Sequence, residues 1–320
     1  MQATKLRTEN TGICCMRLAR TLSSILFPLA FLATVAGAQD DRGRPLVLLI
    51  HGRGMLDRDS AATRKLWLDG LLSGEKTLTQ DSLITPRDVR VVWYADVLDP
   101  RVNSGCDYAS SDPRAKRARG DDDDTQFRGF VGAIGGFLGS ITNLVADSAS
   151  GSELRALAAD AAFLSDARKR CAAEDRLAQA ISRAKSEGRP VILVAHSLGS
   201  LVAYDYLSAI ADSGIVTKFV TIGSPVGSSD FRRLLIGGDT TIARPASVLE
   251  WVNVRNDTDL FAMPLSAGRD VVSMPPPDET DPHEMVGYLR EGATAREIFT
   301  GWCSAFRTRW PLGCNGVIAK

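Results

Sequence analysis

Histidine and cysteine are scarce in this chain of 320 residues, and neither sign of charge is in excess. There are three histidines and six cysteines, and neither residue type clusters at the spacing of zinc ligands. Lysine and arginine together number 38, and aspartate and glutamate also number 38. A chain without a basic excess is not expected to bind nucleic acid or another polyanion. No internal repeat is evident, and nothing in the composition implies a metal ion or an organic cofactor.

Long hydrophobic runs are also lacking, because the apolar run at residues 22–35 falls short of the roughly 20 residues that span a bilayer. Two arginines precede this run and the small residues Ala-Gly-Ala follow it, which is the pattern of a signal peptide with its cleavage site. We therefore predict a signal peptide at residues 1–38 and an exported chain, periplasmic or secreted, at 39–320. An uncleaved anchor is the alternative, and Met16 is an alternative start.

Cleavage at that site would leave a chain that is long enough for one α/β domain with a large core. Removing residues 1–38 leaves 34 basic and 37 acidic residues, so the net charge is near −3. It also leaves four cysteines, and an even number in an exported chain suggests two disulfides. Of the three possible pairings we favour Cys106–Cys171 and Cys303–Cys314.

The most informative stretch is an apolar, β-branched run that begins at residue 190 and ends in AHSLG at residues 195–199. The residues after it have the apolar spacing of a helix, which predicts a strand, a tight turn and a helix. Such a turn strains its central residue, Ser197, and exposes its hydroxyl group. The N–H of Leu198, at the start of the helix, would then face an oxyanion. A strand with a glycine-containing turn also occurs in proteins without a nucleophile, so the remaining motifs must decide.

AHSLG resembles the nucleophile elbow of the α/β-hydrolase superfamily, especially its lipase and esterase branch, with Ala195 in place of the usual first glycine. The resemblance implies an α/β fold with a mostly parallel central sheet, helices on both faces and a helical cap insertion. Alternating β and α patterns along the chain agree with it. A helix is expected at 60–72, and further strands at 45–50, 89–94, 216–222 and 248–254.

The first expected strand ends in His51-Gly52, which resembles the turn that helps to form the oxyanion hole in lipases and esterases. The resemblance implies the backbone N–H groups of Arg53 and Leu198 as the two oxyanion donors. A tight strand-to-helix turn without a catalytic role is the alternative for this dipeptide. This dipeptide occurs in the same chain as the elbow, which favours the catalytic interpretation.

An acid and a base are expected after the strand at 248–254. The loop that follows contains Asp257 and Asp259, and resemblance to lipase-like sequences favours Asp259, with Asp257 as the runner-up. Two histidines belong to the oxyanion turn and the elbow, which leaves His283 as the base, in a loop that opens a helix. Ser197, Asp259 and His283 thus occur in the order nucleophile, acid, base.

The alternating pattern breaks between about residues 99 and 174. An acidic run at 121–124 is most simply a solvated loop, and the apolar, glycine-rich segment at 127–139 is too short to cross a bilayer. Because α/β-hydrolases carry cap insertions at this position, we predict a cap that lines an acyl pocket and contacts lipid peripherally. A helix that simply packs on the core is an equal alternative. Residues 156–185 are expected to form two helices.

Together these residues predict an exported serine hydrolase that cleaves carboxylic esters, lipid esters among them, through an acyl-enzyme on Ser197. No cofactor and no metal ion are implied. A thioesterase, an amidase or an acyltransferase could use the same residues, and a non-catalytic lipid-binding protein of this fold is a further alternative. The expected partner is a small-molecule or lipid ester; its acyl-chain length and the oligomeric state stay open.

Overall fold

The computed structural model divides the chain into two compact units, residues 1–40 and residues 41–320. The described residues all lie in the second unit: 41–99, 101–103, 105–109, 111–115, 163–164, 166–228, 242–274, 280–306 and 311–318. The predicted signal peptide at residues 1–38 lies outside them. Among the described residues, no helix combines the length and the apolar character needed to cross a membrane.

Six parallel strands form one sheet in the order β2-β1-β3-β4-β5-β6. Their bounds are β1 Leu46–Ile50, β2 Val89–Val92, β3 Val191–His196, β4 Val216–Ile222, β5 Val248–Asn256 and β6 Arg269–Ser273. Five of them lie where the sequence predicts strands, and the last does not. This architecture confirms the predicted α/β fold with a parallel central sheet.

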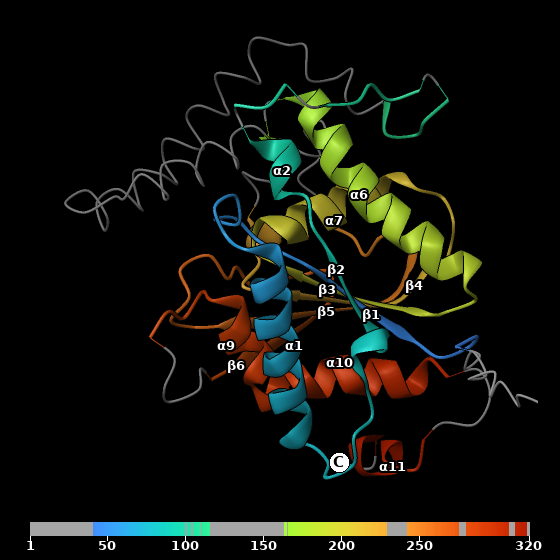
Figure 1. The fold of residues 1–320 in the computed structure, drawn as a ribbon, viewed down its shortest axis with the longest axis vertical. Coiled ribbons are helices and arrows are strands. Elements are labelled where there is room, and N and C mark those ends of the chain that lie inside the picture. Colours follow the sequence, from blue (N-terminus) through green and yellow to red (C-terminus); the bar gives the residue numbers. More distant parts are fainter. Residues whose placement is uncertain are drawn as a thin grey trace, which may run out of the picture. The chain divides into compact units, whose positions relative to one another are not determined.

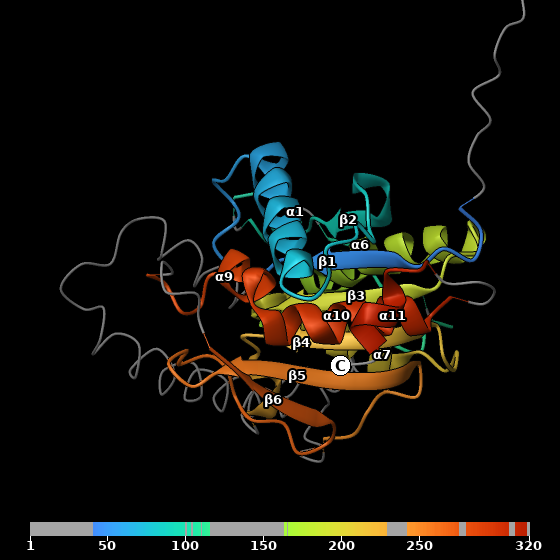
Figure 2. The same ribbon diagram turned by 90° about the horizontal axis from the view of Figure 1, so that it is seen from below.

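Helices cover both faces of the sheet, as Figures 1 and 2 show. On one face lie α2 Ala95–Leu98, α6 Ala167–Ser186 and α7 Leu198–Ala209. On the other lie α1 Ser60–Lys76, α9 Met285–Arg290, α10 Gly292–Ser304 and α11 Cys314–Ile318. Short 3-10 helices occupy Pro86–Asp88 and Pro225–Gly227.

The continuous apolar sequence of β1 follows from this double cover. Leu46, Leu48 and Ile50 join the core beneath α6 and α7, whereas Val47 and Leu49 join the core beneath α1 and α10. Successive side chains of a strand point to opposite faces, so a strand buried on both faces must be apolar at every position. The described strand is buried along its whole length.

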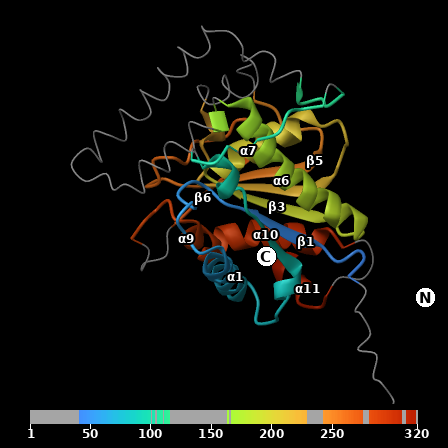
Figure 3. The same ribbon diagram turned by 45° about the horizontal axis from the view of Figure 1, so that its top comes forward.

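The direction in which strands are added reverses between β1 and β3. The chain proceeds from β1 outward to β2, then returns to β3 on the other side of β1 and continues to β6. Figure 3 shows β1 and β3 next to one another, with α6 and α7 on one side and α1 and α10 on the other. In open parallel sheets such a reversal leaves a crevice at the carboxyl ends of the two strands, where ligands bind.

Most of the predicted cap falls outside the described residues, including the acidic run at 121–124 and the glycine-rich segment at 127–139. Of the two helices expected over 156–185, the described part contains α6, a continuous helix from residue 167 to residue 186. Its side chain cap is Asp166, which accepts hydrogen bonds from the N–H groups of Arg168 and Lys169.

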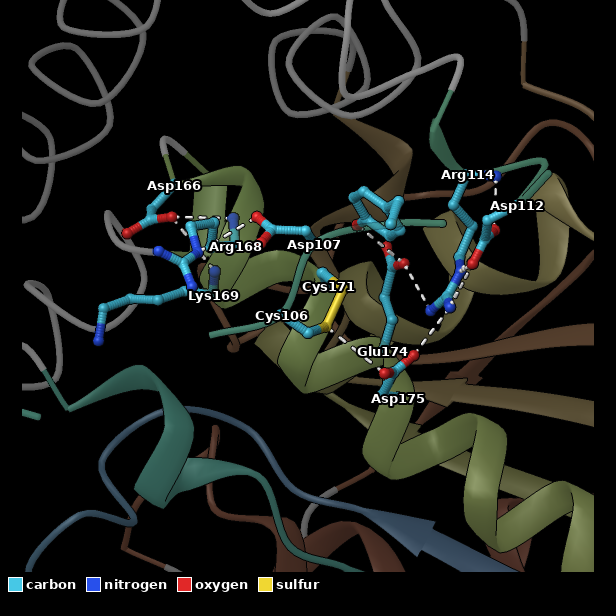
Figure 4. The surroundings of a disulfide bond; sticks show 11 residues. Cys106, Asp107, Asp112, Arg114, Asp166, Arg168, Lys169, Cys171, Glu174 and Asp175 are labelled. Carbon is cyan, nitrogen blue, oxygen red and sulfur yellow. Dashed lines mark hydrogen bonds and ion pairs between the residues drawn. A yellow bond between two sulfur atoms is a disulfide. The ribbon is translucent and has the colours of Figure 1, made fainter. Parts of the chain in front are cut away.

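A disulfide fastens the first part of the predicted insertion to α6 (Figure 4). It joins Cys106 to Cys171, and a second disulfide joins Cys303 in α10 to Cys314 in α11. Both pairings confirm those favoured from the sequence. Near the first disulfide, Arg114 donates hydrogen bonds to Asp112 (2.7 Å) and Asp175 (2.8 Å).

Candidate active site

Residues from three strand ends and one later loop converge at the carboxyl edge of the sheet. His51 follows β1, Ser197 follows β3, and Asp259 lies three residues beyond the end of β5. His283 lies in the segment that leads into α9. Because β1 and β3 are neighbours at the reversal of strand order, the first two residues lie at the crevice expected for a ligand.

Ser197 has the strained backbone expected of an elbow. Its φ of 51° and ψ of −126° make it the only non-glycine residue with positive φ in the described part of the chain. Such a conformation costs on the order of 1–3 kcal/mol and persists only where neighbouring contacts impose it. Here the N–H of Ser197 donates to the carbonyl of Ile222 (3.2 Å), and its carbonyl accepts from the N–H (2.9 Å) and hydroxyl (2.5 Å) of Ser200.

Two buried hydroxyl groups, those of Ser200 and Ser224, continue these contacts with the backbone of Ser197. Ser200 Oγ and Ser224 Oγ are 2.7 Å apart. Because Ser200 donates its proton to the carbonyl of Ser197, Ser224 is the donor between the two hydroxyl groups. Ser224 also accepts from the N–H of Met263 through its own carbonyl (2.8 Å). The segment at residues 221–225, which follows β4, thus connects the elbow to the loop that carries Asp259.

His283 connects Ser197 to Asp259 by hydrogen bonds. Its Nε2 atom lies 2.9 Å from Ser197 Oγ, and its Nδ1 atom lies 2.9 Å from both carboxylate oxygens of Asp259. An ionised carboxylate only accepts hydrogen bonds, so Nδ1 carries the proton and Nε2 accepts the serine proton. This tautomer is the one in which histidine removes a proton from a serine hydroxyl.

The two aspartates of the loop after β5 have different surroundings. The carboxylate of Asp259 has no exposed surface, whereas the side chain of Asp257 is 65% exposed and pairs with Arg255. The structure therefore brings Asp259, and not the runner-up Asp257, to His283. The sequence could not separate them, since both lie within the same short loop.

The carboxylate of Asp259 is held in its ionised form by hydrogen bonds. Burial alone would raise its pKa, but donation from His283, from the hydroxyl of Tyr288 (2.8 Å) and from the N–H of Phe261 (2.9 Å) lowers the pKa below its ordinary value. Sequence reasoning missed Tyr288, because a tyrosine in an apolar helix is typical of a core residue. Its only sequence signal is a position five residues after His283.

His51 braces the turn in which the oxyanion donors are expected. Its Nδ1 atom donates to the carbonyl of Gly52 (2.6 Å), and its Nε2 atom accepts from the N–H of Tyr94 (3.0 Å). Burial lowers the pKa of His51 to about 4, so the ring is neutral and keeps this tautomer. Since the C=O and N–H of one trans peptide point in opposite directions, fixing the Gly52 carbonyl also fixes the N–H of Arg53. Leu198 is the first residue of α7, where an N–H has no partner within the helix.

His196 donates a hydrogen bond to the loop that carries His283, a role that sequence reasoning did not assign. Its Nε2 atom donates to the carbonyl of His283 (2.7 Å), and the centroids of the two rings are 4.8 Å apart. Burial lowers the pKa of His196 to about 3, with the neighbouring His283 contributing in the same direction. The neutral ring therefore acts as a hydrogen-bond donor to the backbone rather than as a base.

Aromatic and cationic side chains stack beside His283. The ring of Phe261 lies 4.4 Å from the His283 ring, centroid to centroid. The guanidinium carbon of Arg53 lies 4.3 Å from the centroid of Phe261, within the range of a cation–π contact. This stack connects the turn after β1 to the loop that carries Asp259.

One group of three possible metal ligands occurs within the described ranges, formed by Cys106, Cys171 and Asp175. The two sulfur atoms are joined in a disulfide. A thiolate is required to bind a metal ion through cysteine, so this group does not offer the ligands of a metal centre.

The fold is that of the α/β-hydrolases, and a strained serine within hydrogen-bond reach of a histidine and an aspartate is typical of serine hydrolases. The family model of lecithin:cholesterol acyltransferase matches residues 172–263, which include Ser197 and Asp259. This similarity covers less than a third of the chain and supports a lipase-like serine hydrolase. No curated protein and no solved structure matches the chain.

Proposed function

We propose that this protein is an exported serine hydrolase that cleaves carboxylic esters, with lipid esters as its substrate class. The observation that carries the proposal is the hydrogen-bonded series Ser197–His283–Asp259 at the reversal of strand order. The similarity of residues 172–263 to lecithin:cholesterol acyltransferase supports the lipid class. The two disulfides support an oxidising compartment, to which a signal peptide at residues 1–38 would direct the chain.

In the proposed reaction, His283 accepts the proton of Ser197 while Oγ attacks the ester carbonyl carbon. The resulting tetrahedral oxyanion is stabilised by the N–H groups of Arg53 and Leu198. Collapse expels the alcohol, which takes the proton from His283, and leaves an acyl group on Ser197. Water then attacks the acyl carbon with His283 again as base, and the acid and free serine are released.

Hydrolysis of p-nitrophenyl esters from short to long acyl chains tests this proposal. We expect turnover by the wild-type chain, together with loss of at least about a thousandfold in folded Ser197→Ala and His283→Ala variants. The chain length that gives the highest kcat/KM would separate an esterase from a lipase. Turnover that survives Ser197→Ala would contradict the proposed nucleophile.

Acyl transfer is a second candidate, because the family model that matches is that of an acyltransferase. The same acyl group on Ser197 would then pass to an alcohol instead of to water. Product analysis with and without an added long-chain alcohol or sterol distinguishes the two reactions. A new ester formed in water at the expense of free acid favours transfer, and free acid alone favours hydrolysis.

A further inference from the structure

The hydroxyl group of Tyr288 lies between two partners that determine its role. It accepts a hydrogen bond from the backbone N–H of Asn256 (3.1 Å) and lies 2.8 Å from Oδ2 of Asp259. The Asn256 amide can only donate, so the single proton of the phenol is directed at the carboxylate. We propose that Tyr288 is a positioning residue for the hydrolysis reaction, which orients Asp259 so that His283 stays aligned on Ser197. This inference rests on the proposed function.

The two carboxylate oxygens of Asp259 are held from different elements. Oδ1 accepts from the N–H of Phe261 in its own loop, and Oδ2 accepts from Tyr288 in α9. His283 Nδ1 lies at equal distance, 2.9 Å, from both oxygens. With one donor on each oxygen, rotation of the carboxylate about its terminal bond would break at least one of these hydrogen bonds. Tyr288 therefore fixes the plane in which Asp259 meets the imidazole ring.

The element that carries Tyr288 is itself closely packed. A Cβ atom placed at Gly70 of α1 would lie 2.9 Å from the side chain of Val286 in α9, so the two helices approach too closely for a larger residue. Tyr288 is buried in the core between α1 and the sheet. Because α9 begins two residues after His283, one rigid segment supplies both the proposed base and the group that orients its acid.

Little space surrounds the hydrogen bond between Tyr288 and Asp259. At Gly223, a Cβ atom would lie 2.9 Å from Oδ2 of Asp259 and 3.2 Å from the Tyr288 ring. Removing only the phenolic oxygen would take away the donor and leave this crowded backbone next to Oδ2 in place. Among the described residues, Oδ2 would then keep only His283 as a side-chain donor, and the carboxylate would lose its fixed orientation.

The hydrogen bond between Tyr288 and Asp259 also affects the pKa of both groups, which has a measurable consequence. The Tyr288 hydroxyl is one of the donors that lower the pKa of Asp259, and burial beside this carboxylate raises the pKa of Tyr288 itself. The phenol therefore stays protonated and donates over the whole working pH range of an enzyme. Without it, the carboxylate becomes more basic, and we expect the acidic limb of the kcat/KM profile to move to higher pH.

The test is Tyr288→Phe, which keeps the ring and removes the donor. We expect kcat on a p-nitrophenyl ester to fall on the order of tenfold to a hundredfold, as for loss of one hydrogen bond to a charged group, with KM within about twofold. Labelling of Ser197 by a fluorophosphonate should slow in parallel. Tyr204→Phe is the matched control, because Tyr204 is likewise a buried tyrosine whose hydroxyl group hydrogen-bonds to backbone, at Ala243.

A double-variant cycle shows whether Tyr288 acts through Asp259. In an Asp259→Ala background we expect Tyr288→Phe to cause no further loss of kcat, since the group that it orients is gone. If the two losses multiply, Tyr288 acts by another route and the proposal is wrong. If Tyr288→Phe does not fold, as judged by near-ultraviolet circular dichroism, 3-fluorotyrosine at position 288 replaces it.

Fluorination keeps the shape of the tyrosine ring and makes the phenol a stronger donor. We therefore expect the acidic limb of the kcat/KM profile to move to lower pH. An unmoved limb and an unchanged kcat would overturn the role of Tyr288 while Ser197→Ala still abolishes turnover. Failure of the wild-type chain to react with any ester or with the fluorophosphonate would instead refute the proposed function, and this role with it.

Discussion

At the residue scale, Gly52 sets how closely the turn after β1 approaches Ser197. A Cβ atom there would lie 2.7 Å from both His196 Nδ1 and Ser197 Cβ, which real Cβ atoms do not tolerate. Both neighbours are buried and are fixed by hydrogen bonds, so the turn itself must move. Such a shift would carry the N–H of Arg53 away from the position that an oxyanion would occupy.

We therefore expect Gly52→Ala to lower kcat on a p-nitrophenyl ester by on the order of a hundredfold, similar to loss of one oxyanion donor. Gly316→Ala is the matched control, since a Cβ atom there meets nothing within 4 Å and α11 tolerates alanine. Steady-state kinetics and thermal melting of both variants check the expectation. A fully active Gly52→Ala variant would exclude this turn from the reaction.

The two aspartates of the loop after β5 offer a paired test. Asp259 is buried against His283, and Asp257 is exposed beside Arg255. We expect Asp259→Asn to lower kcat by on the order of 10³–10⁴, because an amide can stabilise the wrong histidine tautomer. Asp257→Asn should retain kcat within about twofold. Equal losses in the two variants would contradict the assignment of the acid.

Much of the candidate site could be proposed from the residues alone, for definite physical reasons. The elbow requires small residues beside Ser197, and with only three histidines in the chain the candidates for the base are few. The acid could be narrowed only to Asp257 or Asp259, because burial decides between them and depends on distant segments. The roles of His196 and Tyr288 depend on contacts across more than 25 residues of sequence, which no local pattern reveals.

At the scale of elements, Glu291 joins β6 to the start of α10. Its carboxyl group accepts a hydrogen bond from the hydroxyl of Ser273, the last residue of β6. Burial raises the pKa of Glu291 to about 7. The folded state thus favours the protonated form of Glu291. In the unfolded chain this form predominates only below the ordinary glutamate pKa of 4.5.

This raised pKa predicts how stability depends on pH. The contribution of Glu291 is fully present below about pH 4.5 and is lost as the pH rises through about 7. The Glu291→Gln variant cannot ionise at this position. As the pH rises from 5 to 8, we expect its free energy of unfolding to fall less than that of the wild type, by on the order of 1–3 kcal/mol. Urea unfolding at both pH values measures this difference. Equal pH dependence in the two proteins would show that Glu291 ionises freely when folded.

The strand β6 was not predicted, and its position explains why. Among the described strands it lies at the edge of the sheet and pairs with β5 alone, so its sequence, RDVVS, lacks the continuous apolar pattern of the strands buried on both faces. Asp270 in β6 accepts hydrogen bonds from two side chains of β5, those of Asn253 (2.7 Å) and Arg255 (2.6 Å). Polar contacts between strands therefore stabilise a segment whose own residues resemble a loop.

At the scale of the whole molecule, the two disulfides close loops of different size. Cys106–Cys171 spans 65 residues and Cys303–Cys314 spans 11. The chain-entropy relation gives about 4 and about 3 kcal/mol for loops of these lengths. We expect Cys106→Ala/Cys171→Ala to lower the free energy of unfolding more than Cys303→Ala/Cys314→Ala does, in urea titrations at one pH. The reverse order would show that local packing outweighs loop length.

The parallel sheet was the most predictable feature of the whole molecule, because strands buried on both faces leave apolar runs that do not depend on distant contacts. The pairing of Cys106 with Cys171 was also predictable, since few alternatives existed. The cap was the least predictable part: its glycine-rich sequence fits a lid as well as a packed helix. Most of this predicted insertion, at about residues 99–174, lies outside the residues that the structure describes.

The positions of Ser197, Asp259 and His283 in separate segments have a consequence for the life of the chain before it folds. A growing or extended polypeptide carries an ordinary serine alcohol, since its histidine partner lies 86 residues away and is synthesised last of the three. The reactivity proposed for Ser197 would arise only once the segments that carry Ser197, Asp259 and His283 have come together in the folded chain. Covalent labelling of Ser197 would then report the folded fraction of the molecules in a sample.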